Sequence, residues 1–160
     1  MIGRLCGILL HKEAPSLVLD VGGVGYEIDA PMSTFYELPA TGQSVTLYTH
    51  LVVRDDAHLL YGFVRQTQRQ LFRQLLKVNG VGPRVALAIL SGLTDQEFMQ
   101  CLMQEDVARL IKVPGIGRKT AERLIIELRD RVKALGEGAA GAMLPGEGLS
   151  AAPVGAQAEA

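Results

Sequence analysis

The feature that most constrains the fold is an internal repeat with an offset of 35 residues. The segment Leu76–Arg84 aligns with Ile111–Lys119, and the similarity continues into the residues that follow each segment. In each copy, a Gly-hydrophobic-Gly pattern lies between two stretches with helical periodicity, at residues 80–82 and 115–117. The repeat therefore predicts two helix–hairpin–helix units in tandem.

The chemistry of this pattern suits binding to a phosphate backbone. Glycines allow a tight turn and let a ligand approach the main chain closely. The second helix of each unit begins at the second glycine, so its free N–H groups and positive dipole end face outward together. Val81 and Ile116 are expected to plug the hairpins, and Pro83 suits a first helical turn. The predicted backbone-binding residues are Gly80, Val81, Gly82, Arg84, Gly115, Ile116, Gly117, Arg118, Lys119 and Arg123.

A helical hairpin with glycine C-caps is the structural alternative, because such hairpins are common in all-α domains. A single copy would leave the two interpretations about even. Two copies in register, both with basic residues just after the second glycine, favour DNA. An ATP-binding loop is excluded, since neither copy has the spacing of a P-loop.

The first 63 residues have the pattern of short β-strands separated by turns. Apolar and polar residues alternate over residues 26–30 and 45–50, and Gly22–Gly25 predicts a turn. Five such runs favour a small barrel, and an OB-fold is the expected architecture, although periodicity alone also permits a sandwich. Residues 33–38 are expected to add a helical turn.

From Thr67 the period becomes helical, and Thr67 with Gln70 and Thr94 with Glu97 have the capping-box pattern. Glycine, alanine and proline make up 16 of the last 25 residues, which predicts a flexible linker or tail. The fold class is thus α+β. The expected domains are the barrel at 1–63, an all-α tandem helix–hairpin–helix domain at 64–135, and the tail at 136–160.

The charge is divided unevenly along the chain. Residues 1–62 carry a net charge of −4, residues 63–133 carry +6, and the remainder carries −3. The basic middle indicates a polyanionic partner. Two distant cysteines, and the lack of a signal-peptide pattern or a long apolar run, predict a cytoplasmic protein with no metal, cofactor or membrane contact. Arg65, Arg69 and Arg73 repeat every four residues, which favours a solvated helix face.

Asp55 and Asp56 form an acidic pair between two predicted strands of the barrel. A solvated turn is the simplest interpretation, because aspartate is common in turns. A metal site is disfavoured, since only His50 and His58 flank the pair. Arg54 is expected either to position DNA or to pair with Asp56.

Several segments resemble the bacterial RuvA family. They are residues 1–5, the stretch His50–Phe63, Gly80–Pro83 with the following Ala86–Gly92, and Pro114–Leu124. The resemblance runs from residue 1 to about 135. It implies a cytoplasmic homotetramer, with an octamer on DNA as an alternative, that binds four-way Holliday junctions without reading sequence. It also implies the RuvB ATPase and the RuvC resolvase as partners in recombination and repair.

In that family, the position of Asp55 and Asp56 is usually occupied by Glu-Asp and forms an acidic pin at the junction centre. Here the first member is one methylene shorter. The resemblance also implies a non-catalytic subunit whose helicase activity resides in RuvB. Family members continue past the linker into a third helical domain that engages RuvB, so we expect this chain to bind junctions but to lack that contact. The main alternative is a helix–hairpin–helix repair enzyme, such as a glycosylase or a nuclease accessory module. A second alternative is an assembly scaffold that uses the repeats to bind protein.

Overall fold

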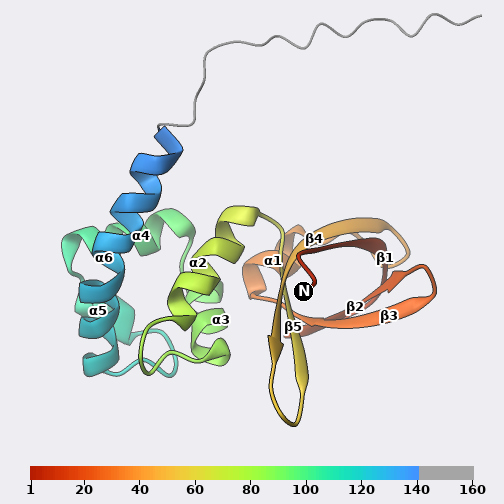
Figure 1. Ribbon diagram of the computed structural model, residues 1–160, viewed down its shortest axis with the longest axis horizontal. Helices are drawn as coiled ribbons and strands as arrows, with labels where there is room; N and C mark the ends of the chain where they lie inside the picture. Colours follow the sequence, from red (N-terminus) through yellow and green to blue (C-terminus); the bar gives the residue numbers. More distant parts are fainter. Residues whose placement is uncertain (141–160) are drawn as a thin grey trace, which may run out of the picture.

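The first part of the chain folds into a closed five-stranded barrel, drawn from red to gold in Figure 1. The computed structural model describes residues 1–140. The strands are β1 (Arg4–Glu13), β2 (Ser16–Val21), β3 (Val24–Asp29), β4 (Ser44–Val53) and β5 (His58–Phe63). They run in the order β1-β2-β3-β5-β4, and a parallel pairing of Asp29 with Tyr61 closes the ring. The five-stranded barrel is confirmed, and the sandwich is excluded.

Alternating apolar side chains fill the barrel interior, as expected for strands with one buried face. Leu9, Leu17, Leu19, Ile28 and Leu47 are all fully buried. Gly62 lets β5 approach β3, because a β-carbon at this position would lie 2.6 Å from Cγ2 of Ile28. The short helix α1 (Met32–Glu37) follows β3 and matches the helical turn expected at 33–38.

Five helices form the second part of the molecule. They are α2 (Gln66–Leu76), α3 (Pro83–Gly92), α4 (Asp95–Gln104), α5 (Val107–Ile111) and α6 (Arg118–Ala140). The apolar faces of these helices share one core. The predicted capping box of α4 is confirmed: Thr94 Oγ1 accepts a hydrogen bond from the Glu97 N–H at 3.1 Å, and the Thr94 N–H donates to the Glu97 carboxylate at 2.9 Å.

The capping box predicted for Thr67 and Gln70 is wrong. Helix α2 begins at Gln66, with Arg65 in the N-cap position and no side-chain hydrogen bond to the cap. Thr67 is therefore already helical, two residues past the N-cap position, where its hydroxyl cannot cap the free N–H groups. Further along the same helix, Phe72 packs against Phe63 of β5, with ring centroids 4.9 Å apart.

The last helix is longer than predicted. Helix α6 continues to Ala140 rather than ending at residue 135, so residues 136–140 are helical. Alanine is the best helix former and glycine costs only about 1 kcal/mol per residue, so a helix can continue past its last apolar contact. The rest of the predicted tail, residues 141–160, lies outside the described residues. Within residues 1–140, no helix combines the length and apolarity needed to cross a membrane.

The barrel and the helices pack against each other directly. Phe72 of α2 lies 4.9 Å from the ring of Phe63 and 5.1 Å from that of Tyr61, measured between centroids. Both barrel residues are buried in the same core cluster as the helices. A second contact joins the start of α1 to the end of α3, where the Met32 N–H donates to Ser91 Oγ at 3.0 Å. The boundary predicted at residue 63 separates two kinds of secondary structure, while side-chain packing is continuous across it.

The solvated face predicted for Arg65, Arg69 and Arg73 is wrong in part, because Arg65, the N-cap residue of α2, is exposed while Arg69 and Arg73 are half-buried. Arg65 forms an ion pair with Glu37 of α1 at 3.0 Å. Arg69 donates to a backbone carbonyl just before β1, and Arg73 Nε donates to Nδ1 of His50 in β4 at 3.0 Å. A spacing of four places the three side chains on one helix face, and that face meets the barrel. These arginines hold α2 against the barrel.

Candidate nucleic-acid interface

The first hairpin joins α2 to α3 and has the geometry that the glycine pattern predicts. Gly80 has a φ of +87°, a left-handed conformation that favours glycine. The Val81 N–H donates to the Val78 carbonyl at 3.1 Å, and the Val81 side chain is buried between the helices. Gly82 is the N-cap of α3, and Pro83 occupies its first turn. The predicted plug and helix start are both confirmed by this geometry.

The second hairpin, between α5 and α6, repeats the first one closely. Gly115 has a φ of +86°, and the Ile116 N–H donates to the Val113 carbonyl at 3.2 Å. Ile116 is buried, and α6 begins at Arg118. Each hairpin thus ends at the first turn of a helix of at least ten residues, where N–H groups lack helical acceptors and the helix dipole favours anions.

The two hairpins contact each other in a reciprocal way that the sequence analysis missed. A β-carbon at Gly115 would lie 3.4 Å from Cγ2 of Val85 in α3, and one at Gly80 would lie 3.9 Å from Oγ1 of Thr120 in α6. The first glycine of each unit therefore lies beside the first turn of the other unit's second helix. Val85 and Thr120 occupy equivalent positions of the repeat, and this pair of β-branched residues was the available signal.

Basic side chains surround the two hairpins. Arg84, Lys119 and Arg123 are exposed, and within residues 1–140 none of them has an ion-pair partner within 4.0 Å. Arg118 is exposed as well, but its Nε lies 3.3 Å from a carboxylate oxygen of Glu122. The structure therefore places the predicted cations around both helix starts, with Arg118 partly neutralised.

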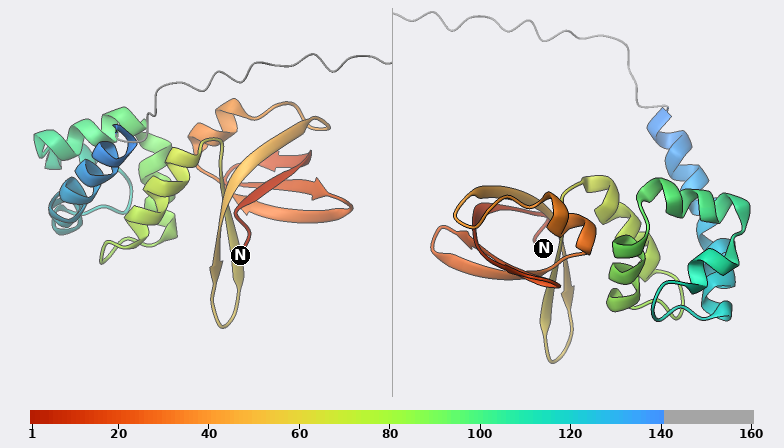
Figure 2. Two further views of the ribbon diagram at one scale, coloured as in Figure 1. Left: turned by 45° about the horizontal axis from the view of Figure 1, so that its top comes forward. Right: turned by 180° about the vertical axis from the view of Figure 1, so that it is seen from behind.

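The acidic pair lies at the tip of the hairpin formed by β4 and β5. Figures 1 and 2 show this hairpin projecting away from the body of the barrel. Asp55 and Asp56 are both exposed, and the Arg54 N–H donates to the Ala57 carbonyl at 2.8 Å to close the turn. A solvent-exposed tip leaves both carboxylates free to meet another molecule.

His50 does not join the acidic pair in a common site. Its Nδ1 accepts a hydrogen bond from Arg73, and burial lowers the pKa of His50, with the charges of Arg73 and Arg69 adding to the effect. Among the described residues, no three His, Cys, Asp or Glu side chains gather closely enough to hold a metal ion.

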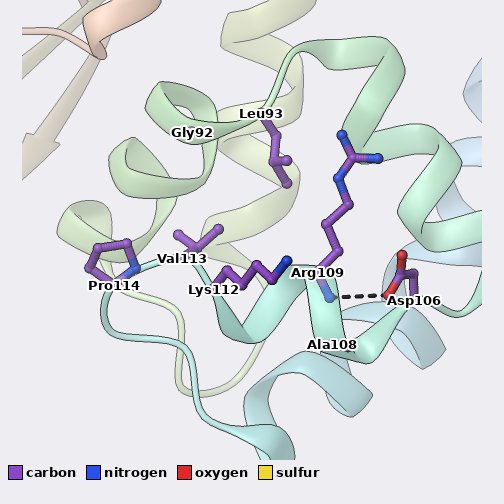
Figure 3. A pocket seen from close by; sticks show the side chains of 8 residues that line it. All are labelled: Gly92, Leu93, Asp106, Ala108, Arg109, Lys112, Val113 and Pro114. Carbon is purple, nitrogen blue, oxygen red and sulfur yellow. Dashed lines mark hydrogen bonds between the residues drawn. The ribbon is translucent and has the colours of Figure 1, made fainter.

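A pocket of about 560 Å³ lies beside the second hairpin, between the end of α3 and helix α5 (Figure 3). Its polar side chains are engaged in structural contacts. Asp106 caps α5 by accepting a hydrogen bond from the Arg109 N–H at 3.1 Å, and the Arg109 guanidinium pairs with Glu97 at 3.0 Å. Lys112 is a third charged residue that lines the pocket.

Two family models match separate parts of the chain. Residues 1–62 match the RuvA N terminal domain, and residues 72–130 match a SAM-like helix-hairpin-helix tandem. Among similar proteins, the Holliday junction branch migration complex subunit RuvA of Shewanella frigidimarina is 60% identical over 141 residues, covering 88% of this chain and 69% of the relative. The same-named protein of Pseudomonas paraeruginosa is 58% identical over 134 residues, covering 84% of this chain and 67% of the relative.

Fold and site together define a two-part protein of the helix–hairpin–helix class, in which a small closed barrel carries a tandem of hairpins. The barrel matches one family model and the helices match the other, in the order in which the structure presents them. The chain belongs to the RuvA family.

Proposed function

We propose that this chain binds four-way DNA junctions through their sugar–phosphate backbones, as the DNA-recognition subunit of a branch-migration complex in recombination and repair. The observation that carries the proposal is the tandem of hairpins, with left-handed glycines at equivalent positions and exposed cations at both helix starts. The names of the relatives, which describe a Holliday junction branch migration complex subunit, support the same conclusion.

Each hairpin acts as a clamp on one strand of a duplex arm. The N–H groups at the start of α3 and α6 donate to phosphate oxygens, and the helix dipole adds a favourable field. Arg84, Lys119 and Arg123 contribute point charges around these positions. Contacts of this kind fix the position of the DNA without reading base edges, so recognition depends on the shape of the junction.

The acidic tip acts by repulsion at the junction centre. With four copies around a fourfold axis, Asp55 and Asp56 place eight carboxylates near the crossover phosphates. A single carboxylate–phosphate pair 10 Å apart repels by about 0.4 kcal/mol in water, and by about 1.7 kcal/mol at an effective dielectric of 20. Summed over many pairs, this term disfavours a stacked junction and favours an open one with separated strands.

The chain works by binding rather than by catalysis in this proposal. It assembles as a homotetramer, or as an octamer on DNA, and the ATP-driven step belongs to the RuvB ATPase. The RuvC resolvase acts on the same junction. These partner assignments rest on family membership.

The test is a gel-shift titration with a synthetic four-way junction and with a linear duplex of equal length and composition. We expect tighter binding to the junction than to the duplex, with equal affinity for junctions of unrelated sequence. Equal affinity for junction and duplex, or a strong dependence on junction sequence, would refute the proposal.

A further inference from the structure

A groove of about 440 Å³ lies where α1, the start of α2 and the link between α3 and α4 meet. Tyr36 lines it from α1, Gln68 from α2, and Asp95 from the first turn of α4. We call this site the Tyr36 groove. It brings together side chains from three separate parts of the chain.

The Tyr36 groove lies away from the first hairpin. That hairpin joins the end of α2 to the start of α3, whereas the groove is bordered by the opposite ends of both helices. Helices of 11 and 10 residues span about 15 Å. Figure 1 shows α2 running from its start at the top to the hairpin below. A molecule bound at the hairpin therefore leaves this groove open.

Two oxygen atoms of the groove residues lack hydrogen-bond donors. Gln68 is only 4% exposed, and within residues 1–140 neither its Oε1 nor Oδ1 of Asp95, which is buried as well, has a partner. Burial raises the pKa of Asp95, and the charge of Arg65 opposes this rise. A buried acceptor without a donor costs about 1–3 kcal/mol, so a donor that enters the groove would stabilise both atoms.

The other charged groups of the groove are already paired. Arg65 Nη1 lies 3.0 Å from a carboxylate oxygen of Glu37. The carboxylate of Glu97 accepts a hydrogen bond from the Thr94 N–H and pairs with Arg109. The ionisable lining carries two carboxylates and one guanidinium, so it is opposite in charge to the surface around the hairpins. The groove therefore suits a positively charged donor rather than a nucleic acid.

The ring of Tyr36 narrows the choice of donor. Tyr36 is 79% exposed and borders the same groove as Asp95. An aromatic face attracts a cation, and a guanidinium is planar, with five N–H donors and no acceptor. An arginine side chain can therefore stack on the ring while it donates to a carboxylate and an amide oxygen, whereas a lysine ammonium is a compact point charge.

We propose that the Tyr36 groove binds an arginine side chain of a protein partner while the hairpins hold DNA. The guanidinium lies on the Tyr36 ring and donates to Asp95 and Gln68. This inference goes beyond the proposed function, because none of these residues belongs to the hairpins or to the acidic tip. It stands whether or not the chain prefers junctions.

The experiment is an NMR titration of the isotope-labelled full chain with the capped tripeptide Gly-Arg-Gly. The same peptide with citrulline, which has the shape of arginine without its charge, is the control. We expect the signals of Tyr36, Gln68 and Asp95 to shift together, and the citrulline peptide to bind at least tenfold more weakly. The absence of shifts at the groove, or equal affinity for the citrulline peptide, would overturn the inference. This comparison uses the unmodified protein.

Two variants and a matched control assign the contacts. Asp95→Asn should weaken binding of the arginine peptide at least tenfold, because it removes a charge-assisted hydrogen bond. Tyr36→Leu should weaken it roughly twofold to fivefold, through loss of the contact between cation and ring. Asp130→Asn, which changes an exposed aspartate of α6, should bind like the unmodified protein. Unchanged affinity of Asp95→Asn would contradict the proposed contact.

A last measurement uses the protein bound to a four-way junction, with saturation-transfer difference NMR on the peptide. The peptide should bind the complex and the free protein equally well, because the groove lies away from the hairpins. Displacement by DNA, or shifts confined to Asp55 and Asp56 in the first titration, would show that the peptide only follows exposed acidic charge, and the inference would fail. A missing preference for junctions over duplex would refute the proposed function and leave this inference intact.

Discussion

The two glycines of a hairpin have different roles, and alanine substitutions separate them. Gly80 has a φ of +87°, so Gly80→Ala forces an alanine into the left-handed region at a cost of about 1–2 kcal/mol. No additional clash is expected, since the nearest atom to the new β-carbon lies 3.9 Å away. For a chain of 160 residues, this cost corresponds to a fall in Tm of roughly 2–8 °C.

Gly82→Ala should show the opposite pattern. Gly82 has a φ of −93° and a ψ of 178°, which alanine adopts freely, and a β-carbon there meets no atom within 4 Å. The loss of a glycine N-cap costs about 0.5 kcal/mol, so Tm should fall by about 2 °C at most. The new methyl group would occupy the space that a phosphate needs to reach the helix N–H groups. Loss of one charge-assisted hydrogen bond, about 1.5–3 kcal/mol, predicts at least tenfold weaker junction binding.

The assay pairs thermal unfolding by circular dichroism with junction titration at one fixed salt concentration. Gly80→Ala should melt earlier and bind nearly normally at a temperature where it is folded. Gly82→Ala should melt normally and bind weakly. If Gly82→Ala bound junctions with unchanged affinity, the start of α3 would not face a phosphate and the clamp mechanism would be wrong.

Three further predictions concern charged and titratable side chains. Lys119→Ala should weaken binding to junctions of every sequence alike and reduce the salt slope by about one, as measured by filter binding from 50 to 200 mM salt; unequal losses between sequences would contradict a backbone contact. The double change Asp55→Asn and Asp56→Asn should leave junction affinity intact or raise it in a gel-shift titration, and abolished binding would show that the carboxylates are ligands or structural groups. Burial holds the pKa of His50 below its usual value. As pH falls below about 6.5, this histidine therefore gains a proton in the unfolded chain before it does so in the folded one. Stability should therefore decline from there toward the lower folded pKa, and His50→Gln, which cannot titrate, should show a shallower decline in urea unfolding at pH 5 to 7.

The sequence predicted those features that depend on local periodicity. It missed those that depend on which other elements pack against a given helix face. Alternation revealed the strands, and the 35-residue offset revealed both hairpins, because the left-handed turns at Gly80 and Gly115 need glycine at fixed positions. The spacing of the arginines in α2 identified one helix face, but nothing local showed that β4 and α1 cover it. The Thr67 error concerns an element boundary, because the N-cap of α2 is Arg65, two residues before the position that the capping pattern indicated.

The continuous packing between barrel and helices matters for a protein that recognises shape. Clamps that contact only phosphates gain selectivity when the distances between them, and between them and the acidic tip, are fixed. Phe72 joins α2 to β5, and Arg73 joins the same helix to β4, the two strands whose hairpin carries Asp55 and Asp56. The first hairpin follows directly at the end of α2, and Val85 and Thr120 each lie beside the first glycine of the other hairpin. The chain therefore holds the tip and both hairpins in one arrangement, and a change that loosened α2 from the barrel should reduce the preference for junctions over duplex before it reduced affinity for DNA in general.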